Sequence, residues 1–100
     1  MKDKFIITVE VIDGFKTQTI TIAGRDAWAL QELVNAGAKG CTPIDHPGPR
    51  WSGYVHKLRK LGIRVETIHE SHGGVFPGRH ARYVLRSRVQ IISTNNVEAA

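Results

Sequence analysis

The side chains best suited to chemistry gather in residues 50–61, RWSGYVHKLRKL. Projected as an α-helix at 100° per residue, this stretch has one apolar side and one polar side. Arginine and lysine pair with phosphates, arginine also contacts guanine through two parallel hydrogen bonds, and serine can bond many bases. The polar side and its flanks supply six candidate nucleic-acid contacts, of which we expect the two lysines to reach phosphates: Arg50, Ser52, His56, Lys57, Arg59 and Lys60.

The apolar side of the same stretch predicts a packed helix that ends at Gly62. Its members are Trp51, Tyr54, Val55, Leu58 and Leu61. Gly53 lies on the polar side and weakens the helix by about 1 kcal/mol relative to alanine. It is either a tolerated small residue or a place where the backbone of another molecule comes close.

A β-hairpin is predicted directly after this helix. Residues 63–70 read as one strand and residues 81–92 as its longer partner, while SHGGVFPGRH between them reads as a flexible loop. Around the loop lie further cations that could meet a phosphate or the minor groove: Arg79, His80 and Arg82. Glu66 and Glu70 share one strand face, where we expect them to balance neighbouring arginines.

The positive charge of the chain is concentrated in this same region. The net charge is +5, but residues 39–88 carry ten basic and three acidic side chains, whereas residues 1–38 carry four basic and five acidic ones. A basic patch attracts polyanions and speeds encounter with them. A solubilising surface is the alternative, and the coincidence of charge with the helix favours a polyanionic partner.

An N-terminal hairpin is predicted before the helices. Residues 4–12 and 15–22 are rich in Ile, Val and Thr, and Asp13-Gly14 is a strong two-residue turn signal. With that turn the predicted register pairs Phe5 with Ile22, Ile7 with Ile20 and Val9 with Gln18, leaving threonines and Glu10 on the other face. This hairpin either extends the second hairpin's sheet through residues 89–92 or forms a dimer edge.

Two more helices are predicted between the hairpins. The first spans residues 25–36, after Gly24 as N-cap and before Gly37, and clusters Ala27, Leu30, Leu33 and Val34 on one face. Trp28 is on nearly the opposite side, where we expect it to pack under the hairpin rather than face a partner. Thr42-Pro43 predicts a short helix that ends at Pro47, and Pro49 can open the helix that follows.

Catalysis, cofactors and metals are not expected. Cys41 is the only cysteine and has no base beside it, so we expect a structural thiol. His69, His72 and His80 match no zinc spacing, and the glycine-rich loop lacks GxxxxGK[ST]. The chain has no apolar run of membrane-spanning length and no leader pattern, so we expect a soluble cytoplasmic protein without a membrane partner.

Residues 27–86 resemble the small winged helix-turn-helix domains common in bacteria and their phages. The resemblance rests on apolar positions of the first helix, on the start of the second, and on the passage from recognition helix to wing strand: Leu30, Leu33, Val34, Thr42-Pro43, Leu58-Arg59-Lys60-Leu61-Gly62-Ile63 and Val65-Glu66-Thr67. The N-terminal hairpin lies outside it. The proline-rich DHPGPRW segment departs from the family's usual tight turn.

The resemblance implies an α+β winged helix-turn-helix, with three helices and a C-terminal hairpin wing, to which the N-terminal hairpin is added. We expect one domain: hairpin 1–23, winged helix 24–92 and a fraying tail 93–100. The expected function is duplex DNA binding through recognition helix 50–61 and wing 63–88, in transcriptional regulation or in phage or mobile-element DNA transactions. The alternative is a non-catalytic protein-interaction module, and the N-terminal hairpin is the expected site of any homodimer or protein partner. Changing Arg59 and Lys60 to Glu should abolish binding and leave the fold intact.

Overall fold

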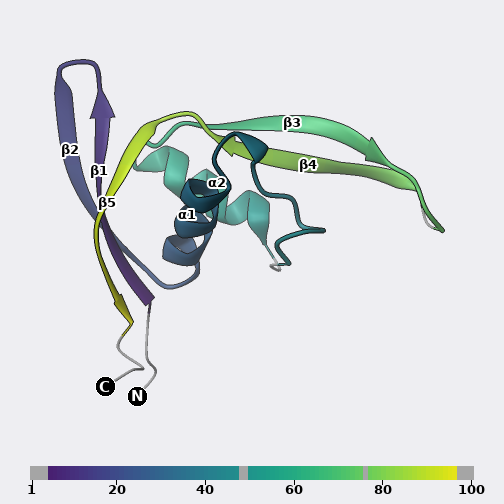
Figure 1. Cartoon of the computed structure of the whole chain (residues 1–100), viewed down its shortest axis with the longest axis horizontal. Helices are drawn as coiled ribbons and strands as arrows, with labels where there is room; N and C mark the ends of the chain where they lie inside the picture. The colour runs from purple at the N-terminus through teal and green to yellow at the C-terminus, as the bar shows by residue number, and fades with distance from the viewer. Residues whose placement is uncertain (1–4, 48–49, 76, 97–100) are drawn as a thin grey trace.

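The computed structural model of the chain describes residues 5–47, 50–75 and 77–96. The described residues form two α-helices beside a three-stranded sheet, and Figure 1 shows the second hairpin extending well past the helices. The mixed α+β class is therefore confirmed. In chain order the elements are β1 (Phe5–Asp13), β2 (Lys16–Ala23), α1 (Arg25–Ala36), the 3₁₀ helix η1 (Gly37–Lys39), α2 (Trp51–Lys60), β3 (Val65–His72), β4 (Gly78–Leu85) and β5 (Arg88–Asn96).

The N-terminal hairpin forms, but its register differs from the predicted one. Asp13 pairs with Lys16, so the two turn residues are Gly14 and Phe15 instead of Asp13 and Gly14. Gly14 has a φ of 63° at the first central position, where a type II′ turn requires glycine. The predicted pairs of Phe5, Ile7 and Val9 are therefore wrong by two residues.

A displacement of two residues leaves the facing of every side chain unchanged, because the side-chain period of a strand is two. Ile7 pairs with Ile22 and Val9 with Ile20, and all four are buried. On the outer face, Thr8 Oγ1 lies 3.0 Å from the Oγ1 of its partner Thr21. The prediction of one apolar and one polar face holds despite the wrong register.

The hairpin is part of a larger sheet with the order β2-β1-β5. β5 pairs antiparallel with β1 from Arg88 to Asn96, with a bulge opposite Thr8 and Val9. The predicted pairing of this hairpin with residues 89–92 is thus confirmed for residues 89–91, but these residues belong to β5, so the hairpin does not extend the β3–β4 sheet. Residues 93–96, predicted as a fraying tail, belong to β5, because their backbone pairs with the start of β1. Residues 97–100 of the predicted tail lie outside the described residues.

The predicted strand over residues 81–92 is two strands in two different sheets. β4 pairs with β3, the chain leaves the sheet at Arg86 and Ser87, and β5 then joins β1. Arg64 fixes this break: its N–H donates to Ser87 Oγ at 2.6 Å, and its carbonyl accepts from the N–H of Arg86 at 2.8 Å. The predicted loop is also shorter than expected, since His72 pairs with Gly78.

The two longer helices lie where the sequence places them, whereas the short helix at Thr42 does not form. Thr42 Oγ1 accepts a hydrogen bond from Asp45 N–H at 3.0 Å, and Thr42 O accepts one from His46 N–H at 2.8 Å. These bonds close a single turn, which Pro47 cannot continue. The three-helix expectation is therefore wrong: the described residues hold two α-helices and η1. Pro49, predicted to open the last helix, lies outside them.

An aromatic cluster joins α1, α2 and β4. Trp51 stacks on Tyr83 with ring centroids 5.8 Å apart, and Trp28 lies 5.5 Å from Trp51 and 6.2 Å from Tyr54. The half-buried Trp28 thus packs in the core, as expected, although against α2 rather than under the hairpin alone. Leu61, predicted on the apolar side of the helix, is 39% exposed just beyond the end of α2.

Candidate nucleic-acid interface

The polar side of α2 faces solvent. Ser52, His56 and Lys60 are exposed, while the opposite side of the helix buries Trp51, Tyr54, Val55 and Leu58 in the core. Arg50, at the start of the helix, and Lys57, on its flank, are exposed as well. The structure therefore brings five of the six predicted helix candidates onto one open surface, with Gly53 half-buried among them.

The sixth candidate, Arg59, is held by the protein itself. Its Nε and Nη2 atoms donate to the carbonyl oxygen of Val65 at 3.1 and 2.7 Å, and Nη2 also donates to Thr67 Oγ1 at 2.9 Å. These bonds tie α2 to the first strand of the β3–β4 hairpin. Arg59 thus positions two elements, and the expectation that Arg59→Glu leaves the fold intact is not supported by this geometry.

Arg25, which no pattern in the sequence singles out, lies beside this surface. A hollow of about 350 Å³ is lined by residues from the start of α1 and from α2: Arg25, Asp26, Arg50, Gly53, Tyr54 and Lys57. Lys57 Nζ lies 3.9 Å from Asp26 Oδ2 across it. Arg25 and Arg50 are 25 residues apart in the sequence, so only the packing of α1 on α2 brings the two together.

The predicted hairpin candidates divide between the two faces of β3–β4. Arg79 shares a face with Tyr83, since residues two apart in a strand point the same way. Tyr83 stacks on Trp51, so α2 covers the part of this face that lies near the core. Arg79 lies on the same face, farther out along the hairpin. The exposed His69, across from Ala81, shares that face. His80 and Arg82 lie on the other face.

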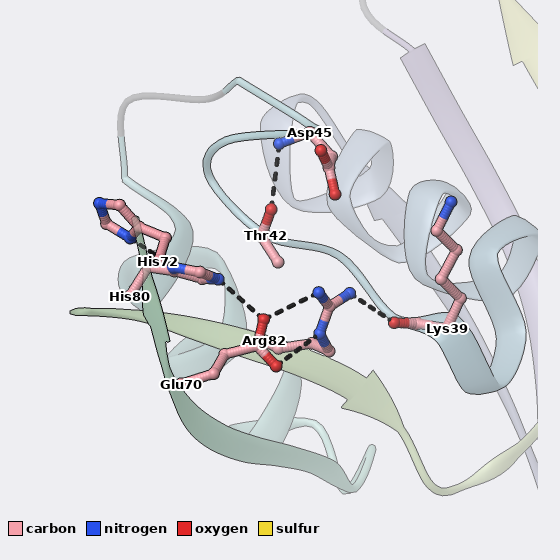
Figure 2. A network of polar contacts seen from close by, with 7 residues as sticks. All are labelled: Lys39, Thr42, Asp45, Glu70, His72, His80 and Arg82. Carbon is pink, nitrogen blue, oxygen red and sulfur yellow. Dashed lines mark hydrogen bonds and ion pairs between the residues drawn. The ribbon is translucent and has the colours of Figure 1, made fainter. Parts of the chain in front are cut away.

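On that other face, His80 and Arg82 converge on Glu70 (Figure 2). Arg82 Nε and Nη2 donate to the two oxygens of Glu70 at 3.0 and 2.8 Å, and Arg82 Nη1 donates to Lys39 O at 2.8 Å. His80 Nε2 donates to Glu70 Oε1 at 2.8 Å, while its Nδ1 lies 2.8 Å from Nδ1 of His72. The charges of this cluster are thus largely satisfied within the protein.

The same contacts set the ionisation of the cluster. Hydrogen bonds from Arg82, and then from His80, lower the pKa of Glu70 from 4.5 to about 2. The carboxylate in turn raises the pKa of Arg82. Arg86 pairs with Glu66 at 2.6 Å, so both glutamates balance arginines as the sequence predicts. Through Arg82 the cluster also connects the β3–β4 hairpin to η1.

Cys41 is a structural thiol, as expected. Its N–H and C=O each form a 2.8 Å hydrogen bond with Tyr83 of β4, and its side chain is buried. Burial raises the pKa of the thiol to about 11. Beside it, Gly40 has a φ of 74°, and a Cβ there would come within 2.6 Å of Tyr83 O. The absence of a side chain at Gly40 thus lets the backbone after η1 pack against the edge of β4.

Comparison with protein families shows a match over most of the chain. Residues 19–95 match a family described as a winged helix domain. The match begins within β2 and runs through both helices, the β3–β4 hairpin and nearly all of β5. Neither curated proteins nor solved structures yield a match. None of the helices in the described residues has the length and apolar composition of a membrane span. Because the family match covers well over half of the sequence, the chain belongs to the winged helix domain family.

Proposed function

We propose that this protein binds duplex DNA, with α2 as the recognition helix and the β3–β4 hairpin as the wing. The observation that carries the proposal is the open polar side of α2, where Ser52, His56 and Lys60 are exposed above a fully packed apolar side. An α-helix of this kind fits the major groove of B-DNA. Membership of a winged helix family supports the same function.

The contacts divide by chemistry and position. Ser52 and His56, near the middle of the exposed side, face base edges, whereas Arg50, Lys57 and Lys60 reach phosphates. On the wing, Arg79 lies on the face shared with α2 and supplies a further contact. Arg59, His80 and Arg82 support the interface from within, because their side chains bond to Val65, Thr67, Glu70 and Lys39.

The protein acts by binding and not by catalysis. A small domain of this kind serves transcriptional regulation or the DNA transactions of phages and mobile elements, in which occupancy of a site is itself the output.

The test is a fluorescence-anisotropy titration with random-sequence duplex DNA at several salt concentrations. We expect log K to fall linearly with log salt concentration, with a slope of about −0.9 for each phosphate contacted. Lys60→Glu should weaken binding about tenfold or more, the loss expected when a charged contact of about 1.5 kcal/mol is removed. Lys16→Glu, the same charge change beside the turn of the β1–β2 hairpin, is the matched control. Equal affinity of both variants and wild type would reject the proposal.

A second candidate function is protein binding through the β1–β2 hairpin, as a homodimer or with another partner. Phe15, in the turn of that hairpin, is fully exposed, unlike most large apolar side chains of this protein. Phe15→Ser should leave DNA affinity unchanged under the first proposal. If it instead lowers the mass measured by sedimentation, the hairpin is an interaction site of the protein with itself.

A further inference from the structure

We infer that the sugar-phosphate backbone of one DNA strand lies in a trough between the start of α1 and the exposed side of α2, with Arg25 as a phosphate ligand. We also infer that Gly53 is small in order to leave that trough open. This inference rests on the proposed function and adds to it a path for the bound strand and a ligand outside the recognition helix and the wing.

The trough consists of two adjoining hollows. The first, of about 350 Å³, includes Arg25, Arg50 and Gly53 in its lining. The second, of about 260 Å³, is lined by Asp26, Lys57, Lys60 and Leu61. Asp26 and Lys57 line both, so the two hollows adjoin each other along α2. From Arg50 to Lys60 the helix rises about 15 Å, enough for more than one phosphate of a strand.

The charge of the trough suits a polyanion. Four cations line it, Arg25, Arg50, Lys57 and Lys60, against the single carboxylate of Asp26. Lys57 Nζ lies 3.9 Å from Asp26 Oδ2, which makes a loose ion pair. The Lys57 side chain is 69% exposed. Within residues 5–47, 50–75 and 77–96, neither Arg25 nor Arg50 takes part in an ion pair. These guanidiniums remain available to a ligand.

Gly53 is not required by the fold. Its backbone is helical, its φ is not positive, and a Cβ placed on it would meet only Arg50 Cβ, at an ordinary contact distance of 3.8 Å. Alanine there would make the helix more stable by about 1 kcal/mol. A methyl group would, however, project into the hollow that Gly53 lines. The close approach of a ligand backbone explains why this position holds glycine and not alanine, which would stabilise the helix.

Two substitutions test the trough. Gly53→Ala should raise or maintain the melting temperature while weakening binding to random duplex DNA several-fold. Arg25→Gln should weaken binding about tenfold and make the salt slope shallower by about 0.9, the value for one phosphate contact. Arg88→Gln, the same change at an exposed position of β5, is the control and should alter neither quantity.

The outcomes separate this inference from the proposed function. One outcome is that Arg25→Gln and Gly53→Ala each bind DNA with wild-type affinity while Lys60→Glu binds more weakly. In that case the inferred path of the DNA strand through the trough is wrong, and DNA binding by α2 stands. If Lys60→Glu also binds as wild type, the proposed function itself fails. A ³¹P NMR titration with inorganic phosphate tests whether the trough binds free phosphate instead of the DNA backbone. Millimolar binding of free phosphate that Arg25→Gln abolishes, with unchanged DNA affinity, would make the trough a site for small anions and overturn the inference.

Discussion

The guanidinium of Arg59, near the end of α2, donates two hydrogen bonds to the carbonyl oxygen of Val65, the first residue of β3. The strand edge at this point is thus bonded to the helix side chain. The two bonds hold the end of α2 against the start of the β3–β4 hairpin. A residue that the sequence suggests as a DNA contact therefore connects α2 to β3.

Arg59→Ala should lower the free energy of unfolding by about 1 kcal/mol, because it removes charge-assisted hydrogen bonds that are partly open to solvent. Lys60→Ala, its neighbour on the same helix, should change it by less than about 0.5 kcal/mol, since no such bonds are lost. Urea denaturation of both variants measures the difference. Equal midpoints would show that the Arg59–Val65 contact contributes nothing to stability.

Acid should weaken the fold through Glu70. The pKa of its carboxyl is about 2 in the folded protein and 4.5 without its partners, so the charged form favours folding. This contribution is complete above pH 4.5 and is lost as the pH falls toward 2. Glu70→Gln should melt at a lower temperature than wild type at pH 6, with the gap closing at pH 2–3. Glu66→Gln, which removes the partner of Arg86, is the matched control, and an identical pH profile for the two variants would count against this role of Glu70.

Gly40→Ala should destabilise the protein by about 2–4 kcal/mol. The φ of 74° disfavours any side chain, and the added Cβ would also meet Tyr83 O at 2.6 Å. Gly37→Ala isolates the first effect, because Gly37 has a φ of 59° but open space around it, and should cost about 1 kcal/mol. Thermal melts of the two variants should therefore rank Gly40→Ala well below Gly37→Ala. The reverse order would refute the close approach of Gly40 to β4.

Cys41 should resist thiol reagents in the folded state. Its thiol is buried and its pKa is raised to about 11, so little thiolate exists at neutral pH. Mixing with a chromogenic disulfide at pH 8 should give slow modification that becomes rapid in 8 M urea. Rapid labelling of the native protein would contradict the packing of Cys41 against Tyr83.

Much of the fold could be predicted because its signals are local. Ala27, Leu30 and Leu33 recur at helical spacing, and the apolar side of α2 does the same. The hairpin register could not be fixed, since both Asp13-Gly14 and Gly14-Phe15 supply a glycine to a two-residue turn. The predicted turn lies one residue before the observed one, so every predicted cross-strand pair is wrong by two residues.

The errors arose where distant residues decide the local structure. The break after β4 depends on Arg64, whose backbone bonds Arg86 and Ser87 from more than twenty residues away. Thr42-Pro43 has the composition of a helix start, but Pro47 ends the helical turn after its first hydrogen bonds. In the candidate site, the exposure of Ser52, His56 and Lys60 followed from helical period alone. Arg25 joined Arg50 only through packing, and the partners of Arg59 and Arg82 depended on a tertiary arrangement.

The most direct test of DNA recognition by α2 is an NMR titration of the ¹⁵N-labelled chain with a short random duplex. We predict that the largest amide shift changes fall on Ser52, Gly53, His56 and Lys60, with smaller ones at Arg25 and Arg79. The amides of the β1–β2 turn at Gly14 and Phe15 should stay unchanged. Shift changes confined to that turn and β2, with α2 silent, would contradict the account.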